Sequence, residues 1–293
     1  MTAVVALRAG WLTARGTIVI ERPLVVGILN ITPDSFWSGG RHHDVEAAVR
    51  HAETLLSDGA DILDVGGEST RPGARPVSVS EETARVVPVI AEIVSRWPHV
   101  PISVDTVKAE VARAAFDAGV WIANDVSGLR LDPEMASTVA SARAGIILMH
   151  SRGGVEQMAR YDLAQYGNDP VGEMVAELDA TAHRARAAGI PREAIVIDPG
   201  LGFSKRTEHS VAAITGLHRF VALGYPVLVG PSRKRFVGDL TGGAQPEDRL
   251  EGTIAACIAA YERGARLFRV HDVRAARRAL DVAFAINVAS ATP

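Results

Sequence analysis

The sequence predicts a (β/α)8 barrel, a TIM barrel, with a short N-terminal β-hairpin, and three patterns support this fold class. Short apolar runs alternate with stretches of helical periodicity, which is typical of parallel βαβ units. There are eight such runs, the number of strands that closes a barrel of this kind. Polar side chains or glycines follow every run, at the strand ends where such barrels carry their active sites.

Two short segments before the first run predict the hairpin. Residues 4–7 and 17–20 are rich in strand-forming side chains and flank Gly10 and Gly16. We expect this extension, residues 1–22, to plug one end of the barrel. The barrel itself is expected at residues 24–288. The whole chain, 1–293, is expected to form one domain, because no Ser- or Pro-rich linker divides it.

The strands and helices of the barrel are predicted from periodicity. The second helix should open at Ser78, which can form a capping box with Glu81, and Pro88 should kink it or split it into two pieces. Two other helices show apolar residues at helical spacing, from Val45 to Leu56 and from Val211 to Val221. The predicted strands are residues 24–29, 62–65, 102–104, 121–123, 146–149, 195–197, 227–229 and 267–270.

Composition narrows the class of protein. With 293 residues, 47% of them hydrophobic and 22% charged, the chain can bury a full core, so disorder is not expected. The net charge of -3 gives no general attraction to nucleic acid or to anionic membranes, and no apolar run is long enough to span a membrane. The single cysteine, Cys257, excludes an internal disulfide and fits a reducing compartment. We therefore expect a cytoplasmic protein with no nucleic acid or membrane partner.

The residues that follow the eight runs would share one rim of the barrel. Such sorting of polar residues to one end indicates a site, since solubility alone would not require it. The residues are Asn30, the segment 66–68, Asp105, Asn124 and Asp125, His150, Asp198, Gly230 with the segment 232–234, and the segment 269–272.

Two carboxylates and an amide at this rim suit a heterocycle with an amino-pyrimidinone edge. Asp105 and Asp198 would face each other, with Asn124 beside them, and carboxylates accept paired N–H donors well. The alternative is that these aspartates only cap the helices that follow them.

Basic residues at the same rim predict an anion site. Lys234 follows the seventh run, where barrels often hold phosphate, and of 31 basic residues only Lys108, Lys205 and Lys234 are lysines. Arg269 and His271 lie on the same side of the last strand by alternation, and Asn30 with the segment 69–71 would complete an anion pocket. The alternatives are a solvated loop around Lys234 and a surface position for Arg269.

Other chemistries lack their motifs. The sequence has no GxxxxGK[ST], no GxGxxG opening a helix, no GxSxG and no HExxH. His42 and His43 have no further ligands at metal spacing. A Mg2+ ion held largely by substrate phosphate needs only one or two protein oxygens and would leave no cluster in the sequence.

The chain resembles the dihydropteroate synthases, a family of pterin-binding barrels, from about residue 24 to residue 285. The matching segments occur in the family's order: 27–36 (GILNITPDSF), 64–73 (DVGGESTRPG), 198–203 (DPGLGF), 232–234 (SRK) and 269–272 (RVHD). The resemblance implies the same barrel fold and a homodimer. It also implies a transferase of folate biosynthesis that joins 6-hydroxymethyl-7,8-dihydropterin diphosphate to p-aminobenzoate, giving 7,8-dihydropteroate and pyrophosphate, and that is a sulfonamide target.

The resemblance also implies roles for individual residues. Asp105, Asn124, Asp198 and Lys234 would hold the pterin ring, with Met149 packed on it and Arg269 stacked nearby. Asn30, Arg269 and His271 would hold the diphosphate, with Asn30 reaching Mg2+. The p-aminobenzoate site would be shaped by Thr70, Arg71, Pro72 and Phe203. The residues expected to act in catalysis are Asp105, Lys234, Arg269, His271 and Arg71.

This chemistry agrees with the residue types at the rim. Loss of pyrophosphate in an SN1-like substitution leaves a cationic methylene conjugated to the pterin, so a carboxylate-lined ring pocket and a cationic, metal-assisted seat for the leaving group are required. The arylamine is a neutral nucleophile and needs no strong general base.

The chain departs from the family pattern in three places. Ser38 stands where the first loop usually has an aspartate, the segment 151–154 differs from the usual Met-Gln-Gly, and Arg235 replaces a frequent serine. Two other functions therefore remain open. One is a pterin-binding methyltransferase, against which Arg71 and the segment 232–234 argue. The other is a paralogue that binds pterin without turnover, which Ser38 would explain.

Overall fold

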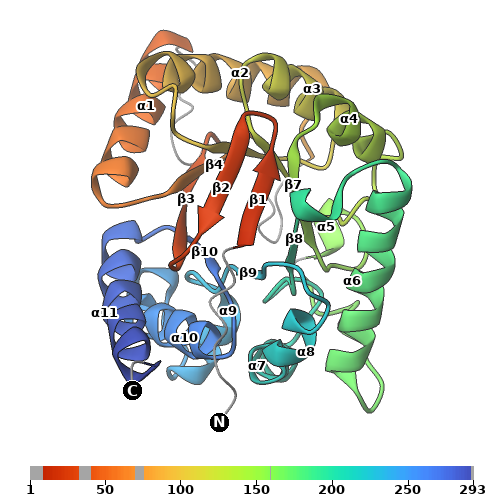
Figure 1. Cartoon of the computed structure of the whole chain (residues 1–293), viewed down its shortest axis with the longest axis vertical. Coiled ribbons are helices and arrows are strands. Elements are labelled where there is room, and N and C mark those ends of the chain that lie inside the picture. Colours follow the sequence, from red (N-terminus) through yellow and green to blue (C-terminus); the bar gives the residue numbers. More distant parts are fainter. Residues whose placement is uncertain (1–8, 33–40, 70–75, 159, 292–293) are drawn as a thin grey trace.

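The centre of the fold is a ring of eight parallel strands, which confirms the predicted barrel (Figure 1). The structure is a computed structural model that describes residues 9–32, 41–69, 76–158 and 160–291. Every predicted run overlaps one strand of the barrel. The strands are β3 (Leu24–Asn30), β4 (Ile62–Gly66), β5 (Ile102–Asp105), β6 (Ile122–Asp125), β7 (Gly145–Met149), β8 (Ile195–Asp198), β9 (Leu228–Val229) and β10 (Leu267–Val270).

The strands follow one another around the barrel in the order β8-β7-β6-β5-β4-β3-β10-β9. The ring closes between β8 and the residues just before β9. There Ile197 forms a parallel bridge with Val227, and the Ile197 N–H donates to the Pro226 carbonyl over 3.0 Å. The closure leaves the carboxyl ends of all eight strands on one rim.

Helices form a layer around the barrel (Figure 1). They are α1 (Arg41–Ser57), α2 (Val79–Arg96), α3 (Ala109–Asp117), α4 (Met135–Ala142), α5 (Val155–Met158), α6 (Pro170–Ala187), α7 (Thr207–Thr215), α8 (Leu217–Val221), α9 (Arg235–Leu240), α10 (Leu250–Glu262) and α11 (Val273–Ala291), with short 3-10 turns at Arg192–Ala194 and Pro246–Asp248.

The strands are apolar along their length because both of their faces are covered. Side chains such as Leu63, Val104 and Ile197 pack outward against the helices in the larger core, and Cys257 of α10 is buried there. Alternate residues, among them Ile62, point into the barrel and form a second, smaller core.

Helix α2 is continuous through Pro88, so of the two predicted outcomes, a kink or a split, the split into two pieces is wrong. Buried residues on both sides of the proline, Val86 and Val89 among them, attach both halves of the helix to the same core. Its N-terminus carries half of the predicted capping box. The Ser78 hydroxyl accepts the Glu81 N–H at 3.2 Å, but the Glu81 carboxylate binds Arg85 instead.

The N-terminal hairpin is present, but its first strand differs from the prediction. Strand β1 (Ala9–Thr13) pairs antiparallel with β2 (Gly16–Ile20), whereas the predicted first strand, residues 4–7, lies outside the described residues. Gly10 belongs to β1, opposite Val19. A Cβ at Gly10 would lie 2.6 Å from a Thr17 methyl group, so the glycine allows close strand packing and does not form a turn.

The hairpin plugs the N-terminal end of the barrel, as predicted, and in Figure 1 it crosses in front of the strands. Trp11 of β1 is fully buried against the inward-pointing Ile62, Ile122 and Val196. Its indole N–H donates to the Ala194 carbonyl at 2.9 Å, which also satisfies the one polar atom of the side chain.

In the part of the chain that the structure describes, no helix combines the length and the apolar character needed to cross a bilayer.

We expect Trp11→Ala to lower the free energy of unfolding by about 3–5 kcal/mol, because it opens a cavity inside the barrel and leaves the Ala194 carbonyl unpaired. Denaturant unfolding measures the loss. Val19→Ala, an exposed position on β2 of the same hairpin, is the control and should change stability by less than about 0.5 kcal/mol. Equal losses in both variants would contradict the plug.

Candidate functional site

The inner face of the barrel carries two layers of side chains. The apolar layer beneath the hairpin includes Ile62, Ile122, Ile147, Val196 and Leu267. Since side chains alternate along a strand, the residue two positions further points inward again, one layer nearer the rim. This second layer contains Asp64, Asn124, Met149, Asp198 and Arg269. The sequence therefore places polar chemistry directly above an apolar floor.

Arg269 joins two carboxylates inside the barrel. Its Nε donates to Asp64 Oδ2 at 2.6 Å and its Nη2 donates to Asp105 Oδ2 at 2.7 Å. Burial alone would lower the pKa of Arg269, but the two carboxylates outweigh burial and raise that pKa above its usual value. Burial raises the pKa of Asp105, and Arg269 limits the rise. The position of Arg269 among carboxylates excludes the alternative of a surface arginine.

Asp64 is a site residue that the sequence reasoning missed. The carboxylate is fully buried and accepts three hydrogen bonds from side chains: Ser103 Oγ at 2.5 Å, Asn124 Nδ2 at 3.0 Å and Arg269 Nε at 2.6 Å. Asn124 lies opposite Asp105 in the sheet register. Asp64 thus fixes the orientation of two predicted substrate ligands at once.

Asp198 and Lys234 come from the ends of β8 and β9, the two strands that follow β10 around the ring. Asp198 Oδ1 accepts the Gly200 N–H at 2.7 Å, so its carboxylate is oriented by its own loop and caps no helix. Burial raises the pKa of Asp198, and the positive charge of Lys234 opposes the rise. Burial in turn lowers the pKa of Lys234 to about 7, although Asp198 pulls it upward. The two groups are therefore charge partners, and Lys234 does not lie on a solvated loop.

Lys234 also contacts the loop that carries Phe203. Its Nζ lies 4.0 Å from the centre of the Phe203 ring and donates to the Leu201 carbonyl. The loop approaches closely because of its glycines. Gly202 has φ +76°, and a Cβ there would come within 3.0 Å of Lys234 Cδ. Any larger residue at this position would push the lysine away from the aromatic ring.

The predicted anion seat is ordered by contacts between the ends of β9 and β10. Ser232 Oγ and His271 Nδ1 lie 2.9 Å apart, and Ser232 Oγ also accepts the His271 N–H at 3.1 Å. Arg233 holds Asp272 with two hydrogen bonds of 2.9 and 2.6 Å. Arg269 and His271 thus emerge from the same strand, but Arg269 is engaged by carboxylates and His271 by a hydroxyl.

Of the remaining predicted site residues, Met149 and Asn30 lie in the described part of the chain. Met149 packs with Val126 and Phe203 in a small apolar cluster at the rim. Asn30 ends β3, and its Oδ1 and the Asp105 carboxylate both lie next to Gly66. The predicted p-aminobenzoate residues Thr70, Arg71 and Pro72, and the departure at Ser38, lie outside the described residues.

The two other departures from the family pattern have structural partners. Arg152 binds Glu173 and Glu177 of α6 and lies 4.1 Å above the Tyr166 ring. Arg235 lies 4.3 Å above the Tyr161 ring. Both side chains are therefore held by neighbouring elements.

Comparison with known proteins identifies the family. Residues 26–271 match the model of the family described as pterin binding enzyme. A dihydropteroate synthase from Synechocystis is 43% identical over 266 residues, which cover 91% of each chain. One from Bacillus subtilis is 44% identical over 254 residues, 87% of this chain and 85% of that protein. The chain belongs to the dihydropteroate synthase family.

Solved structures of the family have the same fold. A dihydropteroate synthase from Xanthomonas albilineans with 4-aminobenzoic acid superimposes with a TM-score of 0.85 at 46% identity, covering 94% of this chain and 96% of that one. The Yersinia pestis synthase in a sulfonamide drug complex gives a TM-score of 0.87 at 36% identity, covering 95% and 99%. These matches, with the curated relatives, support the dihydropteroate synthase expectation over the alternative of a pterin-binding methyltransferase.

We expect Asp64→Asn to reduce the activity of the chain by about 10²-fold, because Asn124 and Arg269 lose the charge that orients them. It should also cost about 3–5 kcal/mol of stability, since the substitution breaks a buried ion pair. Steady-state kinetics and denaturant unfolding separate the two effects. Asp281→Asn, which removes an exposed carboxylate paired with Arg277 on α11, is the control. Full activity of Asp64→Asn would remove this residue from the site.

Proposed function

We propose that the chain condenses 6-hydroxymethyl-7,8-dihydropterin diphosphate with p-aminobenzoate to 7,8-dihydropteroate and pyrophosphate, as a transferase of folate synthesis. The observation that carries the proposal is the set of carboxylates around Arg269, with Asp198 and Lys234 at the ends of the neighbouring strands β8 and β9. A structure of the Xanthomonas albilineans enzyme in complex with 7,8-dihydropteroate superimposes on this chain with a TM-score of 0.81.

The geometry supports a division of the site into a pocket for the pterin ring and a seat for the leaving diphosphate. Asp105, Asn124 and Asp198 offer acceptors and one amide toward a ring with an amino-pyrimidinone edge, above an apolar floor. Met149 provides an apolar surface for the face of that ring. Because these groups are fixed by hydrogen bonds before substrate arrives, they stabilise positive charge that develops on the pterin methylene when the C–O bond breaks.

The opposite charge develops on the leaving diphosphate. His271 at the end of β10, with Arg269 and Asn30 nearby, would stabilise that charge, and Lys234 would bind the pterin ring. The aniline nitrogen then attacks the methylene carbon and loses its proton to solvent. Phe203, next to Lys234, would cover the arylamine. The resemblance to the family assigns Thr70, Arg71 and Pro72, which lie outside the described residues, to the same site.

Mg2+ is part of this proposal, with Asn30 as its protein ligand. The described residues contain no group of three or more His, Cys, Asp or Glu side chains that could hold a metal ion, which fits an ion bound mainly by substrate phosphate oxygens. The Asn30 amide oxygen at the end of β3, beside the Asp105 carboxylate, is the kind of hard ligand such an ion requires. When bound, Mg2+ would neutralise charge on the departing pyrophosphate.

The assay that tests the function measures pyrophosphate and 7,8-dihydropteroate with each substrate omitted in turn. We expect both products only when pterin diphosphate and p-aminobenzoate are present together, and we expect chelation of Mg2+ to abolish them. Calorimetry that shows pterin diphosphate binding, without product by mass spectrometry at high protein concentration, would instead support a binding paralogue. Product that persists after chelation would contradict the proposed role of Mg2+ but not the condensation itself.

We expect Lys234→Ala to lower kcat/KM by 10²-fold or more, if the ammonium group supplies about 3 kcal/mol to the transition state. Arg206→Ala removes an exposed cation from the same rim and should leave kcat/KM within about twofold. The same rate in wild type and Lys234→Ala would show that this lysine does not bind substrate.

We also propose a homodimer in the cytoplasm. The large apolar side chains Val282 and Ile286 on the outer side of α11 are 61% and 62% exposed, which suits a contact with a second copy. A single buried cysteine suits a reducing compartment. Sedimentation equilibrium measures the mass of the assembly.

A further inference from the structure

Lys205 is a lysine inside the wall of the barrel that the proposed reaction does not use. Its side chain is 1% exposed, and it lies behind Phe203, on the loop between β8 and α7. Burying an ammonium group is costly unless all its donors are paired. The buried ammonium group of Lys205 therefore requires hydrogen-bond partners in its surroundings, and these partners indicate what it does.

All three donors of the Lys205 ammonium group have acceptors. The Nζ lies 2.8 Å from His150 Nδ1, 2.9 Å from the Phe203 carbonyl and 3.2 Å from the His150 carbonyl. A lysine ammonium has three hydrogens and no acceptor, so these three partners match it one to one. Burial lowers the pKa of Lys205 well below its usual value, and the negative charge of Asp198 opposes the fall and favours the ammonium form. Lys205 thus links the end of β7 to the backbone of the residue whose ring covers Lys234.

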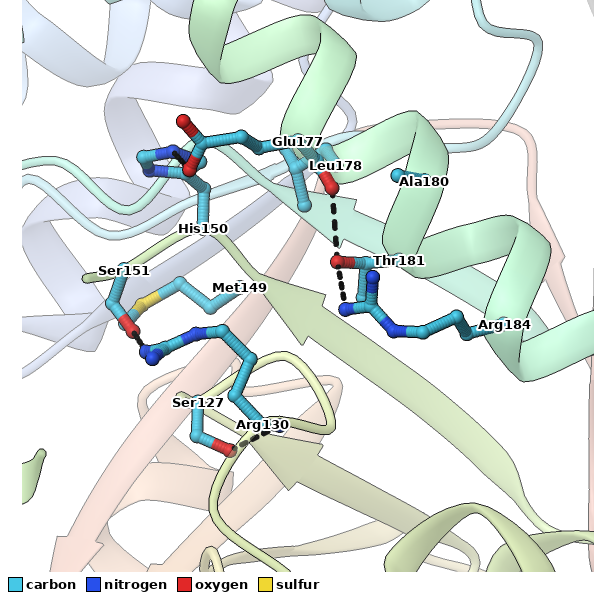
Figure 2. A pocket seen from close by; sticks show the side chains of 10 residues that line it. All are labelled: Ser127, Arg130, Met149, His150, Ser151, Glu177, Leu178, Ala180, Thr181 and Arg184. Atoms are coloured by element: carbon cyan, nitrogen blue, oxygen red, sulfur yellow. Dashed lines mark hydrogen bonds and ion pairs between the residues drawn. The ribbon is translucent and has the colours of Figure 1, made fainter. Parts of the chain in front are cut away.

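The link continues to the edge of α6. If His150 Nδ1 accepts from Lys205, its Nε2 carries the proton and donates to Glu177 Oε2, 3.1 Å away (Figure 2). Burial, with the positive charge of Lys205, lowers the pKa of His150 to about 4, which agrees with a neutral ring between the two charges. Glu177 lines a cavity of about 160 Å3 beside α6, so the outer end of this chain of hydrogen bonds meets solvent.

The loop needs such an anchor because its backbone is unusual. Gly200 and Gly202 have φ +68° and +76°, and Ser204 has φ +49°, a conformation that costs a non-glycine residue free energy. The loop between β8 and α7 has no helix or strand ladder and is tied by single hydrogen bonds. Among them, the Phe203 N–H donates to the Gly200 carbonyl and the Ser204 N–H to the Met158 carbonyl, and Lys205 adds the contact to the Phe203 carbonyl. Without Lys205 the Phe203 carbonyl would lose its hydrogen bond to a side chain.

We propose that Lys205 is a positioning residue for the proposed condensation: from behind the wall it fixes Phe203 against Lys234 and supplies positive charge to the ionised Asp198, without touching substrate. The inference rests on the proposed function only for the kinetic consequence. Asp198 lies beside the residue that Lys205 binds, because the His150 N–H donates to the Asp198 carbonyl at 2.8 Å. Burial raises the carboxyl pKa of Asp198, and the positive charges of Lys234, Lys205 and Arg269 oppose the rise. Removal of Lys205 should therefore loosen the loop and raise the pKa of Asp198.

The first experiment needs no substrate. In protein labelled with 13C-aspartate, the Asp198 carboxyl of Lys205→Met should titrate about one pH unit higher than in wild type, because a neighbouring positive charge is gone. Hydrogen exchange at the amides of residues 200–206 should be at least tenfold faster. An unchanged Asp198 titration together with unchanged exchange overturns the proposal, whether or not the chain makes dihydropteroate.

The second experiment follows the reaction. In Lys205→Met the acid limb of the kcat/KM profile should move to higher pH by the same amount, and KM for p-aminobenzoate should rise at least tenfold, more than kcat falls. Lys205→Gln keeps donors for the two carbonyls without the charge, so it should restore slow exchange but keep the shifted Asp198 titration. If exchange of residues 200–206 stays as fast in Lys205→Gln as in Lys205→Met, the hydrogen bonds do not position the loop.

Lys108→Met is the matched control. Like Lys205, Lys108 lies on a loop after a barrel strand. Its side chain is partly buried and pairs with Glu68 and Glu82. Its loss should lower stability without changing the Asp198 titration or the exchange of residues 200–206. If Lys108→Met reproduces both changes, general destabilisation explains them and the role of Lys205 is refuted.

Discussion

The bridge from Arg269 to Asp64 and Asp105 is the interaction on which the rest of the site depends. It spans three strands, β10, β4 and β5, and places one guanidinium between two carboxylates in a space that water hardly reaches. A buried ion cluster of this kind contributes little stability by itself, since desolvation offsets its attraction, but losing one member leaves the others uncompensated. The cluster therefore fixes the orientation of the side chains in the site. Asp64 orients the Asn124 amide, and Arg269 orients the Asp105 carboxylate.

The positions of the strands and of most site residues could be predicted because two rules act together. A strand covered on both faces must be apolar, so the eight runs are visible in the sequence, and polar residues at their ends must meet on one rim. This logic found Asp105, Asp198 and Arg269. It failed for Asp64, which lies inside an apolar run and looks like a strand residue. The signal was an aspartate between Leu63 and Val65, two positions after the inward-pointing Ile62 and therefore on the same face of the strand.

Other features depend on contacts between distant segments, which no local pattern reveals. The continuity of α2 through Pro88 follows from the core that both halves share. The first hairpin strand is set by the burial of Trp11, and the sequence shows only an aromatic residue next to a glycine. Lys205 is recognisable in the sequence only by its rarity, as one of three lysines, and its partner His150 comes from a strand 55 residues earlier. The roles of Thr70, Arg71 and Pro72 stay predictions.

The hairpin has a consequence for how the chain reaches this structure. Trp11 belongs to an apolar cluster that contains side chains from seven barrel strands, and it donates to a carbonyl 183 residues away, so its site does not exist until the barrel has formed. Such distant contacts slow folding, because the chain loses loop entropy before they repay it. The hairpin is thus among the last elements to find its place, although it precedes every barrel strand in the sequence, and until it does the N-terminal end of the barrel stays open and apolar.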